Sequence, residues 1–171
     1  MAQAAAALLG QQRRELGIGE QNASLASEEV LGVRWRPPEA TTLRGIQPPH
    51  HSRHADYVAR LADAYRRGDP VPPVVALRFG SELRALCGSH RIAAMGARFS
   101  SVQAAEQAGA IIILEAVDIL ATARAAGDRD AVHELTRSDP WTMFPQVLQH
   151  LWPHLPAHAR HALRTEQRIP G

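Results

Sequence analysis

Apolar and polar residues alternate with two different periods in the middle of the chain, and together they predict helices packed on strands. In "ADYVARLADAYRRGD" (residues 55–69) the apolar side chains recur at helical spacing, and Gly68 is a typical residue at a helix end. The apolar runs at 71–79 and 83–87 are separated by the turn residues "GSE". This pattern predicts a helix followed by a β-hairpin.

The residues after the hairpin predict two more helices and a further strand. Gly88 and Ser89 end the hairpin, and Ser89 is a good candidate for the N-cap of a helix over 90–99. A helix over 101–109 then leads into the apolar segment "AIIILEAVDI", which predicts a strand over 110–119.

The two flanks differ from this middle region. The first part is rich in Ala and Gln and predicts a helix over 3–16, followed by a short strand over 28–35. Beyond residue 119 the pattern predicts only short helices separated by Gly or Pro. We therefore predict an α/β (α+β) fold with a small mixed sheet and packed helices. Its parts are an N-terminal helical or flexible segment at 1–27, a core at 28–120 and a C-terminal helical extension at 121–171.

The composition is that of an ordinary globular protein. Of the 171 residues, 45% are apolar and 21% are charged. The longest apolar run is broken by Glu115 and falls short of the roughly 18 residues that span a bilayer. Cys87 is the single cysteine, so no internal disulfide can form. We expect Cys87 to be buried and to act as a small apolar residue. We expect a cytoplasmic protein with no membrane partner.

All 19 basic residues are Arg, and the formal net charge is +2. Arg presents a planar, permanently charged fork that suits carboxylates and phosphates. Two of them, Arg78 and Arg84, lie on the predicted hairpin and could extend a basic patch towards the turn that follows it. A pI near 9.3 is compatible with nucleic-acid contact, but so small a net charge does not argue for it.

The junction "CGSHR" has the chemistry of an anion site. The first N–H groups of a helix are unpaired, and the helix dipole favours negative charge there. Gly88 allows the backbone to approach a ligand, and Ser89 offers a hydroxyl. His90 and Arg91 add donors in the first turn. The alternative is a capped helix whose His and Arg are merely exposed, and the residues alone leave both open.

The order of these elements resembles a known family. The helix at 55–69, the "VPPVV" strand, the hairpin and "GSHRIAAM" are similar to the ParB N-terminal and sulfiredoxin-like fold. Its members carry Pro-Pro before the strand and a Gly-x-(His/Arg)-Arg-x-x-Ala turn after the hairpin. The resemblance covers residues 55–99 and extends more loosely to 43–54 and 110–119. Ser89 stands where sulfiredoxins have their reductive Cys, so that activity is not implied. The later Glu-Asn-x-x-Arg type motif of the ParB-like CTPases is not found in this sequence.

The resemblance implies a nucleotide or another phosphate ligand. The ligand would be held by Gly88, Ser89, His90 and Arg91, with Arg53 closing the site from the upstream loop. The resemblance also implies CTP or ATP with Mg²⁺, and phosphoryl transfer or nucleotide hydrolysis if chemistry occurs. No catalytic residue is assigned. The alternative function is a non-catalytic, DNA-associated module of the partition or regulatory type, whose Arg side chains contact backbone phosphates. A homodimer is left open.

The upstream loop holds further candidates. His50, His51 and His54 lie together, and they are compatible with a metal site, with a phosphate contact or with a solvated loop. Free-serine kinases of the same fold use a catalytic carboxylate, for which Glu39 and Asp56 are the candidates here.

Four histidines recur near the C-terminus at near-helical spacing. Pro153 and Pro156 argue against one continuous helix, so we expect surface or packing roles, with a metal or partner site as the alternative. The neighbouring segment "DPWTMFPQVLQHLW" predicts core packing, or an interface if it is exposed. The four histidines are His150, His154, His158 and His161.

Overall fold

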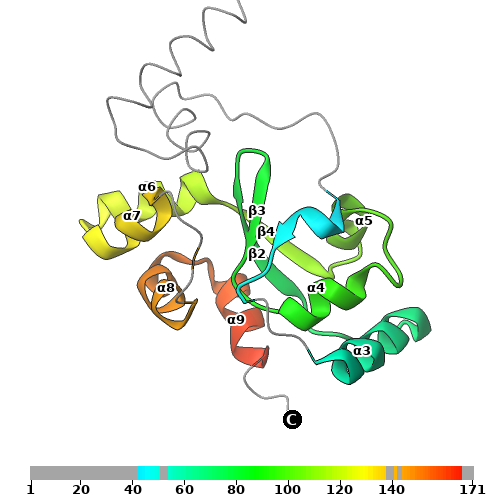
Figure 1. Ribbon diagram of the computed structural model, residues 1–171. Coiled ribbons are helices and arrows are strands. Elements are labelled where there is room, and N and C mark those ends of the chain that lie inside the picture. Colours follow the sequence, from blue (N-terminus) through cyan, green and yellow to red (C-terminus); the bar gives the residue numbers. More distant parts are fainter. Residues whose placement is uncertain (1–41, 51–53, 138–140, 142–143, 167–171) are drawn as a thin grey trace, which may run out of the picture.

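The computed structural model describes residues 42–50, 54–137, 141 and 144–166 (Figure 1). The helix expected over 3–16 and the strand expected over 28–35 lie outside the described residues. The described part is a mixed α/β structure. None of its helices is long and apolar enough to cross a bilayer.

Four short strands form one mixed sheet, and three of them lie in segments where the sequence predicts strands. The strands are β1 (Ile46–Gln47), β2 (Val74–Phe79), β3 (Glu82–Ala85) and β4 (Ile111–Glu115). Their order across the sheet is β1-β3-β2-β4. The hairpin strands β2 and β3 are antiparallel, whereas β1 is parallel to β3 and β4 is parallel to β2. The strand β1 was not expected, because its two residues lie in a segment punctuated by Pro.

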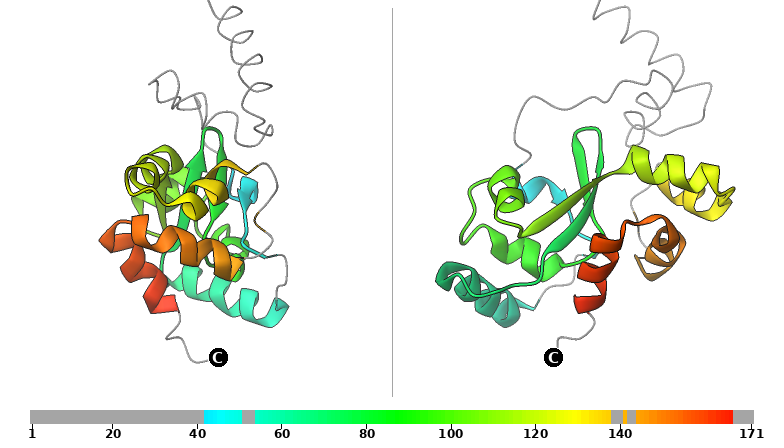
Figure 2. Two further views of the ribbon diagram at one scale, coloured as in Figure 1. Left: turned by 90° about the vertical axis from the view of Figure 1, so that its left-hand side faces the viewer. Right: turned by 180° about the vertical axis from the view of Figure 1, so that it is seen from behind.

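Helices cover both faces of this sheet (Figures 1 and 2). One face carries α3 (Ala55–Arg67), α4 (Ser89–Met95) and α5 (Val102–Gln107). The other face carries α6 (Ala116–Ala125), α7 (Arg129–Thr136), α8 (Phe144–Leu151) and α9 (Ala157–Glu166). Two 3₁₀ turns, η2 (Leu43–Gly45) and η3 (Trp152–His154), precede β1 and α9.

Strand β2 serves both hydrophobic cores. Val75, Leu77 and Phe79 pack with the helices α6–α9, whereas Val74 and Ala76 pack with α3, α4 and α5. Successive side chains of a strand point to opposite faces, so a central strand covered on both sides must be apolar almost throughout. This explains why β2 is apolar at every position except Arg78 and does not alternate.

The strand expected over 110–119 ends earlier than predicted. β4 stops at Glu115, and α6 begins at Ala116. Ala116, Ile119 and Leu120 recur at helical spacing, and all three are buried against the sheet. This core-facing stripe favours a helix over the strand propensity of the preceding Ile residues.

The described part of the aromatic segment that contains α8 packs into the core, as expected. Trp141, Val147 and Leu151 are buried. The Trp141 ring meets Phe79 of β2 edge-on, with the ring centroids 5.6 Å apart. The C-terminal helices therefore share one core with the sheet.

The basic patch expected from the hairpin is not formed. Arg84 is only 2% exposed, and its guanidinium carbon lies 4.6 Å from the Phe79 centroid and 5.6 Å from the Trp141 centroid. It therefore lies on the face that carries α6–α9, on the far side of the sheet from α4. Arg78 is paired with Glu115 at 3.1 Å. The prediction was wrong because the alternation of side chains along β3 directs Arg84 into the hydrophobic core that contains Phe79 and Trp141.

The C-terminal histidines have packing and surface positions. Pro153 lies in η3, which separates α8 from α9, so the four histidines form no continuous stripe. His154 is buried, with Nε2 2.7 Å from Oδ2 of Asp128, and Nδ1 of His150 lies 3.5 Å from Oε1 of Glu134. The remaining two, His158 and His161, are exposed on α9.

Asp128 joins the N-terminus of α7 to η3. Its carboxylate accepts a hydrogen bond from the Ala131 N–H at 3.1 Å and contacts His154. The hydrogen bond with His154, and then those from the backbone, lower the pKa of Asp128 from its usual 3.8. The stability that this carboxylate contributes is therefore present above pH 3.8 and is lost as the pH falls through its lower pKa in the folded chain.

We expect Asp128→Asn to be less stable than the wild type near neutral pH and to lose less of its stability on acidification. Urea unfolding from about pH 2 to pH 7 measures both effects. Asp130→Asn is the matched control, since Asp130 is exposed in the first turn of the same helix. Equal pH dependence in Asp128→Asn and in the wild type would contradict the assignment.

Candidate anion-binding site

A left-handed glycine starts α4. Gly88 has a φ of 82° and occupies the N-cap position, and no side chain caps the helix. The expectation that Ser89 is the N-cap was wrong, because Gly88 makes the turn and Ser89 is already the first helical residue. The Ser89 side chain is buried, and its Oγ accepts a hydrogen bond from the His50 N–H at 3.4 Å. Ser89 thus ties the segment after β1 to the start of α4.

The Arg91 side chain points into the protein and packs against the turn at Gly88. Its side chain is 4% exposed, and Nη1 donates to the carbonyl oxygens of Pro72 at 2.7 Å and Pro73 at 2.8 Å. A Cβ atom on Gly88 would lie 2.9 Å from Nε of Arg91 and equally close to Cγ2 of Val74. The guanidinium therefore packs directly under a turn that only glycine fits.

His90 is the centre of a group of rings. Its ring is stacked on that of His54, with centroids 5.6 Å apart and an interplanar angle of 4°. Tyr57 and His50 approach it edge-on, at centroid distances of 5.1 and 6.0 Å. We call His50, His54, Tyr57 and His90 the ring cluster. His50 and His54 are exposed, whereas Tyr57 and His90 are half-buried, so solvent reaches the cluster.

The ring cluster brings the beginnings of two helices together. The backbone N–H of His54, the N-cap of α3, donates to Nε2 of His90 at 3.1 Å. The His54 side chain does not cap α3, so its imidazole is stacked over His90 instead. Both helices begin beside these imidazoles, and the positive end of a helix dipole favours an anion over a cation.

Tyr65 on α3 lies deeper in the same region. It is 3% exposed and meets Phe99 edge-on at a centroid distance of 5.9 Å. Burial raises the pKa of Tyr65 to about 12, although the charge of Arg91 opposes this shift. The phenol stays protonated throughout the physiological range.

The structure brings together most of the residues expected at the junction. Gly88, Ser89, His90 and Arg91 form one turn, whereas Arg53 and His51 lie outside the described residues. In the part of the chain that the structure describes, no group of three or more His, Cys, Asp or Glu side chains could hold a metal ion. The metal interpretation of the upstream histidines includes His51, which lies outside the described residues, and it therefore stays a prediction.

Two features of the site were not recognised from the sequence. Tyr57 stands one turn after His54 on α3, and this i, i+3 spacing is the signal that could have placed it beside His90. The inward direction of Arg91 has no local signal, since it depends on carbonyl groups that are distant in the sequence. Cys87, by contrast, is buried as expected, and its Sγ accepts a hydrogen bond from the Val75 N–H.

Compared with family models, with curated proteins and with solved structures, the chain has no match, and its resemblance to the ParB N-terminal and sulfiredoxin-like family stays a prediction from its own residues.

Proposed function

We propose that this protein binds a phosphate-bearing anion, with a nucleotide as the expected ligand, at the junction of the Gly88–Arg91 turn with the first turn of α3. The observation that carries this proposal is the ring cluster, which gathers three imidazoles at the beginnings of two helices. Imidazoles donate hydrogen bonds and can be protonated near neutral pH, and both properties suit a phosphate. The resemblance of the turn to the phosphate-binding turn of the ParB-like family supports the same ligand.

The proposed site residues have different roles, because some are buried within the protein and others are reached by solvent. Ser89 and Arg91 are buried and bonded within the protein, so their role is to position the turn. Gly88 lets the turn pack closely on Arg91 and Val74, because an added Cβ would lie 2.9 Å from their side-chain atoms. The exposed His54 and the half-buried His90 are the side chains of the site that solvent reaches, and their planar rings offer a surface on which a base can stack.

The residues described around the turn do not fit a metal site of their own. Asp56 is in the first turn of α3, but it belongs to no cluster of potential ligands in the described part of the chain. Glu39 lies outside the described residues. Any Mg²⁺ would therefore come with the phosphates of the nucleotide, and we propose binding without assigning a reaction.

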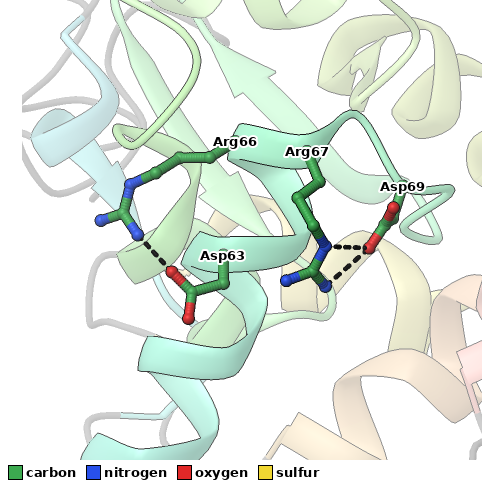
Figure 3. A network of polar contacts seen from close by, with 4 residues as sticks. All are labelled: Asp63, Arg66, Arg67 and Asp69. Carbon is green, nitrogen blue, oxygen red and sulfur yellow. Dashed lines mark hydrogen bonds and ion pairs between the residues drawn. The ribbon is translucent and has the colours of Figure 1, made fainter.

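The alternative, binding of DNA through a basic surface, is disfavoured by the pairing of the cations on α3. Arg66 is paired with Asp63, and Arg67 donates to Oδ2 of Asp69 from Nε at 2.9 Å and from Nη2 at 2.7 Å (Figure 3). These exposed carboxylates offset part of the positive charge of the two Arg residues. A protein that neutralises many DNA phosphates binds with an affinity that falls steeply as salt is added.

A thermal-shift panel with CTP, ATP, GTP and pyrophosphate, each with Mg²⁺, tests the proposal. We expect one nucleotide to stabilise the wild type, by about 2.7 kcal/mol at a hundred times its dissociation constant. His90→Ala should weaken that nucleotide at least tenfold, which corresponds to about 1.4 kcal/mol. His158→Ala is the matched control, because His158 is exposed on α9, outside the ring cluster.

The proposal fails if no nucleotide shifts the melting temperature. It also fails if His90→Ala binds the nucleotide as tightly as the wild type and the control His158→Ala do. Retention of duplex DNA that falls steeply between low and moderate salt, with no nucleotide effect, would favour the alternative.

A further inference from the structure

The hydrogen bond between His54 and His90 defines the protonation state of His90. The backbone N–H of His54 is a donor, so Nε2 of His90, 3.1 Å away, must accept with its lone pair. An imidazole that accepts at Nε2 is neutral and carries its proton on Nδ1. In the structure described, the two groups therefore satisfy each other, and neither presents a donor to a ligand at that point.

Two permanent cations, Arg60 and Arg91, lie in the surroundings of His90, and like charge nearby disfavours a second proton on its ring. His54 and His50 bring two further titratable rings, and Tyr57 brings a phenol, over which the Arg60 guanidinium carbon lies 5.7 Å from the ring centroid. Arg91, the next residue on α4, adds a permanent positive charge whose guanidinium is directed to the carbonyl groups that precede β2. A proton on Nε2 of His90 would also face the N–H group of His54, and two donors so close together repel each other.

We propose that anion binding at this site is coupled to the uptake of one proton by His90. This inference rests on the proposed function. A proton from solvent adds to the Nε2 lone pair, and the hydrogen bond from the His54 N–H breaks. The His54 N–H and the new Nε2–H are then two donors side by side, and one oxygen of the anion accepts from both. The negative charge of the anion offsets the positive charge placed among the rings.

This coupling makes the site sensitive to pH in a defined direction. The bound form carries one proton more than the free form wherever His90 is neutral in the free protein. Affinity therefore rises up to tenfold for each pH unit by which the pH is lowered, and it levels off once free His90 is itself protonated. Neutral His90 offers no Nε2–H donor to the anion. Acidification, or a ligand with sufficient negative charge, favours the protonated form that does.

Imidazole NMR on the full-length chain tests the inference directly. The ring signals of His90, assigned by their loss in His90→Gln, are followed from about pH 5.5 to 8.5, a range in which imidazoles titrate. The titration is done alone, with sulfate and with the nucleotide that gives the largest thermal shift. Sulfate is included because its own charge is constant over this range, so any proton taken up belongs to the protein.

The expected result near neutral pH is a neutral, Nδ1-protonated His90 in the free chain and a doubly protonated ring in the complex. His90→Gln should bind with little pH dependence, and His158→Ala should behave as the wild type. A bound complex in which His90 stays neutral, with constant affinity across the range, overturns the coupling and leaves the proposed function standing. Absence of binding by the wild type at every pH overturns both. If His90→Gln does not fold, the titration of the wild type decides alone, with His90 assigned through its backbone.

Discussion

Replacing Arg91 with alanine is expected to lower the free energy of unfolding by about 3–5 kcal/mol. The substitution removes a buried cation whose Nη1 donates to two carbonyl oxygens, those of Pro72 and Pro73. Hydrogen bonds to charged groups contribute about 1.5–3 kcal/mol each, and the two carbonyls would lose their donor. Urea denaturation at pH 7, followed by circular dichroism, measures the change.

Two variants make this test specific. Arg91→Lys keeps the charge but offers no fork, so it should recover only part of the stability. Arg60→Ala removes an exposed Arg of α3 and should change stability by less than about 1 kcal/mol. If Arg91→Ala unfolds like Arg60→Ala, the inward position of Arg91 is wrong.

The same expectation changes how binding experiments on Arg91 are interpreted. A turn held by Arg91 from below would lose its shape in Arg91→Ala, so weaker ligand binding in that variant would not show that the guanidinium touches the ligand. His90→Ala is the sharper probe, because His90 is half-buried and its ring belongs to the solvent-accessible cluster. The positioning and the contacting residues of the site are therefore separable by experiment.

Local pattern predicted much of the fold. The helix α3, the β2–β3 hairpin, the turn at Gly88 and the start of β4 all lie where apolar periodicity and turn residues place them. The errors came from competition between local signals and packing. The Ile-rich run ends at Glu115 because the residues after it present a helical stripe to the core. The short strand β1 depends on its pairing with β3, which no local pattern contains.

The turn at residues 88–91 was predicted in its position, but the directions of its side chains were not. The residue types at 88–91 indicate a turn with donors, and the structure has such a turn. Their directions depend on partners that are distant in the sequence. Ser89 is bonded to His50, Arg91 to Pro72 and Pro73, and His90 to His54. Sequence spacing could group these residues, but only the tertiary contacts decide which of them face solvent.

Gly88→Ala is expected to lower the free energy of unfolding by about 2–4 kcal/mol, from two separable causes. The first is the left-handed backbone at a φ of 82°, which costs a residue with a Cβ about 1–2 kcal/mol. The second is overlap, since the new Cβ would lie 2.9 Å from side-chain atoms of Arg91 and Val74. Thermal and urea unfolding of the purified variant measure the sum.

Two other glycines separate these causes. Gly109 has a φ of 73° but nothing within 4 Å of an added Cβ, so Gly109→Ala should show the backbone cost alone. Gly96 has a φ of −62° and equally open surroundings, so Gly96→Ala should be neutral or stabilise by up to about 1 kcal/mol. If Gly88→Ala costs no more than Gly109→Ala, the close packing of Arg91 under the turn is contradicted.

A double-mutant cycle then connects the two largest predictions. Removing the Arg91 side chain takes away part of the overlap that the new Cβ of Gly88→Ala would meet, so the two substitutions should couple, and the double variant should be more stable than the sum of the single effects predicts. The coupling should be incomplete, because Val74 and the positive φ remain. Full additivity would mean that the turn and the guanidinium are independent, and the turn would then owe its shape to the backbone alone.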